Sequence, residues 1–478
     1  MGGGPLIPLT LGEIARVTGG SLHGDASAVV DGEWVIDSRR AGPGGMFVAV
    51  VGEKADGHCF APAAMAAGAA AVLGTLPVAA PSVLVDDVPA ALAALARFVL
   101  AGLPAVQVAG ITGSSGKTST KDLAAQLVER LGPTIAPVGS FNTEYGLPLT
   151  VLRATEATRY MVLEMSARGI GHIAYLCRIA PPRYGVVLNV GHAHAGEFGG
   201  VDQIAVAKGE LPAALPADGV AILNADDPRV LAMAARTHAR VVTFGCADPA
   251  ASASASASAS APAGIRAADV RLDHLGRASF RLLTPEGSAP VTLRLHGAHH
   301  VPNSLAAAAL ARELGLGLDD IADALSAALP RSRWRMEVTE RPDGVIVIND
   351  AYNANPESVR AALDALGHLA RDGRAFAVLG HMAELGDSSP AAHREAGAYA
   401  AALGITGLIA VGDEAAPILD GARKSGSWHG EAIAVPDGAS ALAILRDRLK
   451  PGDVVLIKAS RAASLEGVAV ALGSEADQ

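Results

Sequence analysis

The residues with the clearest chemistry form a glycine loop at positions 112–119, which reads Thr-Gly-Ser-Ser-Gly-Lys-Thr-Ser. It joins a strand-like, β-branched run at 106–111 to a helix-like run at 119–131. Gly113 and Gly116 let backbone N–H groups turn inward around phosphate oxygens, and the helix start adds the positive end of its dipole. The loop therefore predicts a site for a nucleoside triphosphate.

Two side chains after the last glycine sharpen this prediction. We expect Lys117 to reach the terminal phosphates and Thr118 to hold Mg²⁺. The general pattern G-x-x-x-x-G-K-[ST] has a glycine at 111, where this chain has Ile111, so the loop is a shorter variant. The alternative is an ordinary glycine turn, which seldom needs a Lys-Thr pair. The other loop residues expected to contact the nucleotide are Ser114, Ser115 and Ser119.

Polar residues follow the next two strand-like runs, 160–164 and 184–189. A P-loop Mg²⁺ keeps several waters and takes one or two protein oxygens, so we expect Glu164, at a strand tip, to be a metal ligand. His194 either satisfies local hydrogen bonds or joins the metal, and its position beside the loop favours the metal. From its spacing alone, Lys208 is predicted to be a solvated surface lysine.

A second polar cluster follows strand-like runs near the C-terminus. Residues 350–356 read Asp-Ala-Tyr-Asn-Ala-Asn-Pro, and residues 458–461 read Lys-Ala-Ser-Arg. The cations of the second segment could bind a phosphate or a carboxylate. The alternative is that Asp350 or Asn355 only caps a helix, with Pro356 in its first turn.

Composition bounds the fold that must position these residues. At about 100–200 residues per domain, 478 residues suggest two to four domains, and we assign three. Hydrophobic residues make up 50% and aromatic residues only 4%, which favours an α/β protein of helices packed on sheets. The net charge of −10 argues against nucleic acid as a partner.

Three scattered cysteines predict neither a disulfide framework nor a zinc site, and they fit a reducing cytoplasm. Residues 1–20 lack the pattern of a signal peptide. The alanine-rich region 61–108 is interrupted by prolines and charges too often for a membrane span. We therefore expect a cytoplasmic protein without a membrane segment.

The alternation of strand-like and helix-like runs predicts three units, 1–102, 103–330 and 331–478, the last two with mostly parallel sheets. We expect a strand hairpin over 265–295 and a helix over 304–329. The Ala-Ser run at 251–261 predicts a flexible surface loop without chemistry.

Taken together, the motifs resemble those of the Mur ligase family across almost the whole chain. The resemblance is carried at the N-terminus by Asp37-Ser38-Arg39 and 56–60, in the middle by the 112–118 loop and 141–148, and at the end by 333–337, 350–356, 380–386 and 458–461. It implies a small UDP-substrate domain, a central ATP domain and a C-terminal Rossmann-like domain that closes on ATP and the second substrate.

The resemblance also implies roles for individual residues. Glu164 and His194 would bind magnesium, and Lys208 would be carboxylated by CO₂ to a carbamate that holds a second Mg²⁺. Further ATP contacts would come from Asn303, Arg335 and Asp350. The implied substrate contacts are Ser38, Arg39, Asn142, Thr143, Tyr352, Asn353, Asn355, Lys458, Ser460 and Arg461.

Four positions depart from the family pattern. Thr143 and His300 stand where asparagine is common, so an adenine contact at 300 is not expected. His381 replaces a usual aspartate and Ala459 a usual glycine. None of these departures removes a proposed metal ligand.

Within the family, the Tyr-Asn-Ala-Asn-Pro form at 352–356 implies D-alanyl-D-alanine as the amine substrate. The implied reaction joins it to UDP-N-acetylmuramoyl-tripeptide through an acyl phosphate, with ATP and two Mg²⁺, in peptidoglycan precursor synthesis by a monomer. One alternative is a ligase that adds a single amino acid as the third residue. Another is a nucleotide-dependent switch or binding module without ligation.

Overall fold

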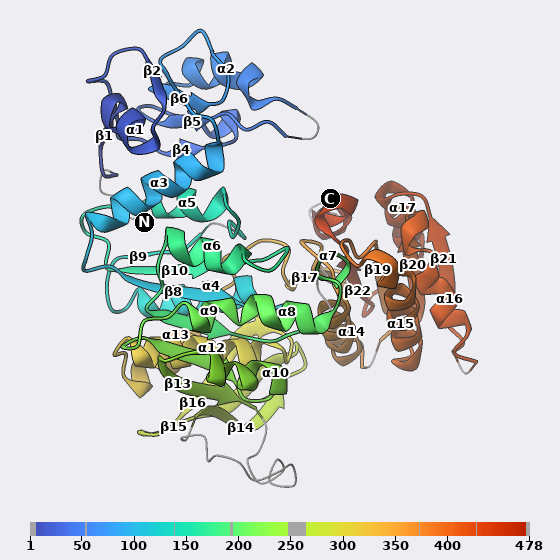
Figure 1. Ribbon diagram of the computed structural model, residues 1–478. Helices are drawn as coiled ribbons and strands as arrows, with labels where there is room; N and C mark the ends of the chain where they lie inside the picture. Colours follow the sequence, from blue (N-terminus) through green and yellow to red (C-terminus); the bar gives the residue numbers. More distant parts are fainter. Residues whose placement is uncertain are drawn as a thin grey trace.

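The computed structural model describes residues 6–52, 55–137, 139–191, 195–246, 264–371, 373–426 and 428–474. Figure 1 shows three bodies: an N-terminal one in blue, a central one from cyan to yellow, and a C-terminal one in orange and red. Each body is built around its own main β-sheet. His194 and the Ala-Ser run at 251–261 lie outside the described residues.

The N-terminal sheet has the strand order β2-β7-β6-β5-β4. The long helix α3 (Val88–Ala101) is capped by Asp87, whose side chain accepts the N–H of Ala90. The strands are β2 (Ser21–His23), β4 (Trp34–Val35), β5 (Met46–Val48), β6 (Ala71–Gly74) and β7 (Ser82–Leu84), with helices α1 (Leu11–Thr18) and α2 (Ala61–Ala66).

The central sheet has nine strands in the order β16-β15-β14-β13-β12-β11-β8-β10-β9. Strand β8 (Gln107–Thr112) lies between β10 (Tyr160–Glu164) and β11 (Tyr184–Val187) and is parallel to both. The segments that follow these two strands therefore flank the glycine loop that follows β8. The remaining strands are β9 (Thr134–Ile135), β12 (Val220–Asn224), β13 (Arg240–Gly245), β14 (Ile265–Leu272), β15 (Arg277–Thr284) and β16 (Gly287–His296).

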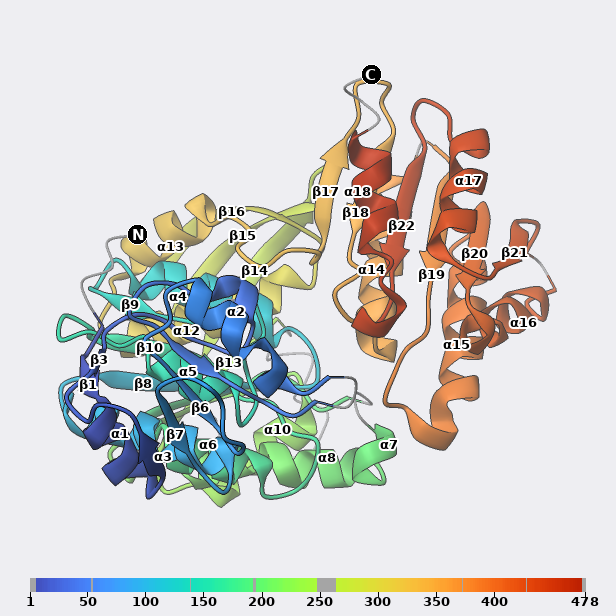
Figure 2. The same cartoon turned by 90° about the horizontal axis from the view of Figure 1, so that it is seen from above.

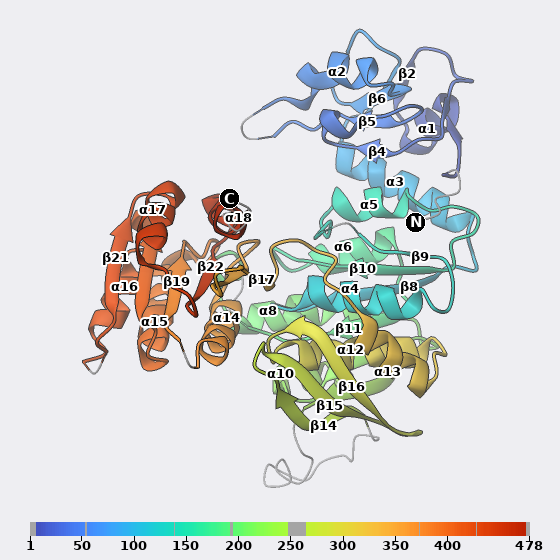
Figure 3. The same cartoon turned by 180° about the vertical axis from the view of Figure 1, so that it is seen from behind.

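Helices cover both faces of the central sheet. On one face, α4 (Lys117–Val128) packs against α12 (His300–Glu313), with α13 (Leu318–Ala327) beside them (Figure 3). On the other face lie α5 (Gly146–Val151), α6 (His172–Ile179), α8 (Val201–Lys208) and α9 (Glu210–Ala213) (Figure 1). The buried apolar side chains of these helices exclude water from both faces of the sheet.

Two expectations for this region need correction. The region 265–295 forms three antiparallel strands, β14 to β16, rather than a two-stranded hairpin. The single helix expected over 304–329 is two helices, because Gly315 adopts φ +100° and ends α12 before Gly317 leads into α13.

The C-terminal sheet has the order β17-β18-β22-β19-β20-β21 (Figure 2). The edge strand β17 (Glu337–Glu340) runs antiparallel to β18 and was not expected. The parallel strands are β18 (Ile346–Asn349), β22 (Val454–Lys458), β19 (Ala375–Leu379), β20 (Gly407–Val411) and β21 (Glu431–Val435), as the alternating pattern predicted. Helices α14 (Pro356–Leu369), α15 (Ser389–Ala402) and α16 (Pro417–Arg423) cover one face, and α17 (Gly438–Arg448) and α18 (Glu466–Ser474) cover the other.

Within the described ranges, every helix is too short or too polar to serve as a membrane span.

Candidate active site

A cavity of about 1010 Å³ lies where the glycine loop and the ends of central strands face the C-terminal body. Most of the residues singled out in the sequence line it, although they come from positions as distant as 114 and 461. They are Ser114, Ser115, Gly116, Lys117, Thr118, Ser119, Asn142, Thr143, Glu164, Asn303, Arg335, Asp350, Tyr352, Asn353, Asn355, Lys458, Ser460 and Arg461.

Backbone geometry explains the glycine that precedes the lysine of the loop. Gly116 adopts φ +79° and is the N-cap of α4. A Cβ atom there would come within 2.5 Å of the Asn303 Oδ1 atom. The loop can therefore approach α12 this closely only with glycine at 116.

Lys117 begins α4 and points its ammonium back over the loop, where Nζ donates to the Gly113 carbonyl at 2.8 Å. Burial lowers the pKa of Lys117, and the nearby Arg335 cation lowers it further, whereas the carboxylates of Glu164 and Glu384 oppose the shift. The surrounding side chains thus compensate the ammonium poorly, which favours an anion as its partner.

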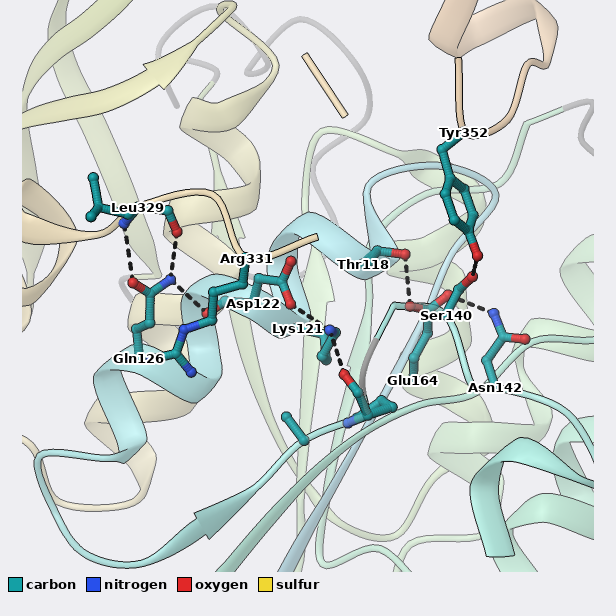
Figure 4. Close-up of polar contacts among 12 residues, drawn as sticks. Thr118, Lys121, Asp122, Gln126, Ser140, Asn142, Glu164, Leu329, Arg331 and Tyr352 are labelled. Carbon is teal, nitrogen blue, oxygen red and sulfur yellow. Dashed lines mark hydrogen bonds and ion pairs between the residues drawn. The ribbon is translucent and has the colours of Figure 1, made fainter. Parts of the chain in front are cut away.

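Glu164 is the centre of the hydrogen bonds beside the loop (Figure 4). Its carboxylate, on a residue only 1% exposed, accepts the Thr118 hydroxyl at 2.8 Å and the Asn142 amide at 2.7 Å. Hydroxyl and carboxylate oxygens are the hard ligands that Mg²⁺ prefers. These donors fit a magnesium ion that completes its shell with water and phosphate, although the described residues contain no cluster of three His, Cys, Asp or Glu side chains.

Lys208 does not lie on the surface, so the expectation from its local sequence is wrong. It is the last residue of α8 and only 5% exposed, because α8 and α9 pack under α6. Burial lowers its pKa well below the ordinary value, and the Lys117 cation adds to the shift. Lys208 is not among the residues that line the cavity.

Asn189, which follows β11, was not predicted as a site residue. Its Oδ1 atom accepts the backbone N–H groups of Ser114 and Ser115, both at 2.9 Å. The Nδ2 atom donates to the Ser115 carbonyl at 3.2 Å. The only available signal was its place at the end of a strand beside the loop.

Two adjacent histidines also line the cavity. Burial lowers the pKa of His299 and lowers that of His300 well below its ordinary value. The His300 Nδ1 atom is buried without a hydrogen-bond partner in the described part of the chain. His300 therefore contributes a neutral imidazole to the lining of the cavity.

On the opposite wall, Asp350 and Lys458 form a buried ion pair, with Nζ 2.5 Å from Oδ2. Lys458 also donates to the Asn353 carbonyl at 3.0 Å, and Asp350 accepts the Met336 N–H at 3.1 Å. This pair ties β22, β18 and the chain entering β17 together.

For Asn355, the structure confirms the helix-cap interpretation. It is the N-cap of α14, in a capping box with Ser358. Its Nδ2 atom also donates to the Ser114 carbonyl at 3.4 Å, so the cap reaches the glycine loop of the central body. Asp350, in contrast, caps no helix.

Aromatic rings support the cations of this wall. The Arg335 guanidinium lies 4.3 Å from the centre of the Tyr352 ring, and Arg461 lies 4.4 Å from that of Trp334. The Tyr352 hydroxyl is hydrogen-bonded to the Ser140 hydroxyl of the central body (Figure 4). Ser460, next to Arg461, accepts the Ala383 N–H at 2.9 Å.

The two residues of the N-terminal body that were expected to contact the substrate lie away from this cavity. Ser38 and Arg39 are in a 3-10 turn, and the Arg39 side chain is 87% exposed in an ion pair with Asp37. Neither lines the cavity.

Comparison with known families matches most of the chain. The description "Mur ligase family, catalytic domain" matches residues 34–101, "Mur ligase middle domain" matches 111–311, and "Mur ligase, glutamate ligase domain" matches 334–461.

Among curated proteins, the UDP-N-acetylmuramoyl-tripeptide–D-alanyl-D-alanine ligase of Mycobacterium tuberculosis is 46% identical over 512 residues, which cover 98% of each chain. The enzyme of the same name from Escherichia coli is 34% identical over 98% of this chain and 99% of its own.

Solved structures match in the same way. A crystal structure of MurF from Acinetobacter baumannii superposes with a TM-score of 0.84 at 31% identity, over 98% of this chain and all of that one. MurF ligase from Thermotoga maritima in complex with ADP gives 0.76 at 31% identity, over 93% and 98%.

Proposed function

Because this chain belongs to the Mur ligase family, we propose that it is an ATP-dependent ligase that joins D-alanyl-D-alanine to UDP-N-acetylmuramoyl-tripeptide in peptidoglycan precursor synthesis. One observation carries the proposal: the phosphate loop and the 352–356 segment, Tyr-Asn-Ala-Asn-Pro, face each other across a single cavity. A phosphorylated acid and an incoming amine can meet there.

The chemistry requires activation, because a carboxylate is a poor electrophile and hydroxide a poor leaving group. An oxygen of the tripeptide carboxylate attacks the γ-phosphorus of ATP, and ADP leaves. The amine nitrogen of D-alanyl-D-alanine then attacks the acyl carbon, phosphate leaves with the bonding pair, and the nitrogen loses a proton to give the amide. Water must be excluded from the acyl phosphate, and a cavity closed by two bodies can do this.

The loop residues bind and orient the polyphosphate. Backbone N–H groups at the start of α4 and the Lys117 ammonium face the developing negative charge, and they act most strongly where water is excluded. Gly113, Ser114, Ser115, Ser119, Asn303, Arg335 and Asp350 complete the proposed nucleotide site.

Magnesium would be held by Thr118 and Glu164, whose oxygens already meet at 2.8 Å, and by His194. It supplies charge neutralisation of the phosphates and of the attacking carboxylate. We place a second ion at a carbamate on Lys208. The lowered pKa of Lys208 supports this assignment, because the neutral amine is the form that reacts with CO₂.

We divide the chain into 1–102, which binds the UDP substrate through Ser38 and Arg39, 103–330, which binds ATP, and 331–478, which closes over ATP and the dipeptide. The remaining substrate contacts are assigned to Asn142, Thr143, Tyr352, Asn353, Asn355, Lys458, Ser460 and Arg461. We propose a cytoplasmic monomer, since ATP and nucleotide-linked precursors are cytoplasmic metabolites and one chain supplies both walls of the cavity.

The decisive experiment supplies the purified chain with ATP, Mg²⁺ and a UDP-muramoyl peptide, and compares phosphate release with different amines. We expect release with UDP-N-acetylmuramoyl-tripeptide and D-alanyl-D-alanine, and none with single amino acids. Release that depends on a single amino acid would identify a ligase that adds the third residue. Turnover that is independent of any amine would indicate a nucleotide switch instead.

A further inference from the structure

We infer that Asn189 shapes the phosphate-binding loop and thereby sets the affinity for the nucleotide, an inference that rests on the proposed function. Asn189 is the second residue after β11, the strand that pairs with β8 on the side away from Glu164. Its side-chain amide makes three hydrogen bonds to the backbone of two consecutive loop residues, Ser114 and Ser115, and also accepts the Ser115 hydroxyl at 3.4 Å.

The loop lies directly against this strand extension. The Leu188 N–H donates to the Thr112 carbonyl at 3.0 Å, so the pairing of β11 with β8 continues to the start of the loop. A Cβ atom on Gly113 would come within 2.9 Å of the Leu188 Cβ atom. The Ser114 N–H is shared between the Asn189 carbonyl, at 3.1 Å, and the Asn189 side chain.

A second contact to Ser114 comes from Gly191, two residues after Asn189. The Gly191 N–H donates to the Ser114 hydroxyl at 2.8 Å. The first turn of the loop is therefore attached to the chain after β11 through both backbone and side-chain atoms.

This arrangement divides the N–H groups of the loop into two sets. Those of Ser114 and Ser115 point at Asn189 and are occupied. Those of Gly116, Lys117 and Thr118 belong to the first turn of α4, where backbone donors have no partner inside the helix. We assign phosphate binding mainly to this second set of N–H groups. Asn189 leaves these groups available to phosphate because its bonds to Ser114 and Ser115 fix the conformation of the loop.

Only an amide side chain can both accept the two loop N–H groups and donate to the Ser115 carbonyl at this position. Asparagine accepts two N–H groups and donates to a carbonyl. Aspartate would keep both acceptor contacts, but it cannot donate to Ser115 and would place a negative charge beside the polyphosphate. Alanine would release the turn altogether.

The test is calorimetric titration of the full-length chain with ADP, together with the KM values for ATP and D-alanyl-D-alanine. We expect Asn189→Ala to bind ADP about tenfold or more weakly and to raise the KM for ATP equally, because the side-chain hydrogen bonds that order the loop are lost. The KM for D-alanyl-D-alanine should not change. Asn189→Asp should bind ADP at least as weakly as Asn189→Ala while retaining the wild-type melting temperature.

The matched control is Gln126→Ala. Gln126 also uses its amide to hold a backbone segment, accepting the Leu329 N–H at 3.1 Å and donating to the Leu329 carbonyl at 3.0 Å (Figure 4). It is not among the residues that line the cavity. It should lower the melting temperature and leave ADP binding unchanged.

Three results would overturn the inference. ADP binding within about twofold of wild type in Asn189→Ala and Asn189→Asp would do so, as would an equal loss in Gln126→Ala. A wild-type chain that does not bind ADP would defeat the proposed function and this inference with it, whereas unchanged binding by the Asn189 variants defeats the inference alone.

Discussion

The two walls of the cavity handle their charges in opposite ways. On the loop wall, the Lys117 ammonium donates to the Gly113 carbonyl and makes no ion pair within the described residues. Lys208, which lies outside the lining of the cavity, also has no ion-pair partner in that part of the chain. On the C-terminal wall, Lys458 is paired with Asp350, and Arg461 is paired with Glu466 and stacked on Trp334.

This difference indicates a division of labour. A buried cation without a partner costs folding free energy, so its retention points to a ligand that supplies the missing charge. A paired cation holds its own wall in shape. Substitutions on the loop wall should therefore remove activity more than stability, and those on the C-terminal wall should show the reverse balance.

The largest effect is expected from Lys117→Ala. We expect phosphate release to fall by at least about 10³-fold, because the main cation facing the transferring phosphoryl group is lost. The melting temperature should be unchanged or higher, since burial lowers the pKa of this lysine. Lys424→Ala, an exposed lysine, is the control and should keep full activity. A folded Lys117→Ala variant with wild-type activity would contradict the proposal that cations of the loop wall serve the reaction.

Lys208→Met should lower activity by about 10²-fold, with no recovery on adding bicarbonate. It should also stabilise the chain. The pKa of Lys208 in the folded state lies well below the ordinary 10.5, so between these values the unfolded chain binds more protons and wild-type stability rises with pH.

The stability gain of Lys208→Met over the wild type is therefore greatest below the pKa that Lys208 has in the folded chain, and it decreases toward pH 10.5. Melting curves in CO₂-depleted buffer from about pH 6 to about pH 9 measure it. A variant less stable than wild type at every pH would show that Lys208 is paired after all.

On the other wall, Lys458→Met should mainly destabilise. It leaves the Asp350 carboxylate without its cation, and we expect the free energy of unfolding to fall by about 3–5 kcal/mol. Denaturant unfolding measures this loss. The double variant with Asp350→Asn should recover most of it, since no charge is then left alone. No recovery would mean that the pair does not hold this wall together.

The smallest effect is expected from Tyr352→Phe. It removes the hydrogen bond to Ser140 but keeps the ring under Arg335, so kcat/KM should fall by only about 2–10-fold. Adding Ser140→Ala should cause little further loss, because both substitutions break one contact. Additive losses in a double-mutant cycle would argue that the two hydroxyl groups act separately.

Much of the fold was readable from local patterns. The strand predicted at 160–164 is β10 (Tyr160–Glu164), and the helix expected from Pro356 is α14, because strand alternation and an N-terminal proline act over a few residues. The edge strand β17 and the break at Gly315 were missed. The first depends on pairing with a distant strand, and the second on the conformation of one glycine within an apolar run.

In the site, too, the features that depend on local sequence could be predicted, and those that depend on distant neighbours could not. The places of Lys117 and Glu164 beside one cavity could be predicted, since the loop follows one recognisable strand and Glu164 ends another. The burial of Lys208 and the contacts of Asn189 could not. They arise because β11 lies next to β8 and because α8 packs under α6, and neither relation is encoded in short-range spacing.

From the amino-acid order alone, one can tell which residue types stand at the ends of which strands, and their resemblance to a family implies the class of reaction. Which of these side chains meet, which charges are paired and which lysine is buried depends on how the elements pack. The physical reason is range: propensity and periodicity act within a turn or a strand, whereas burial and pairing depend on neighbours hundreds of residues away, as between Ser114 and Asn355.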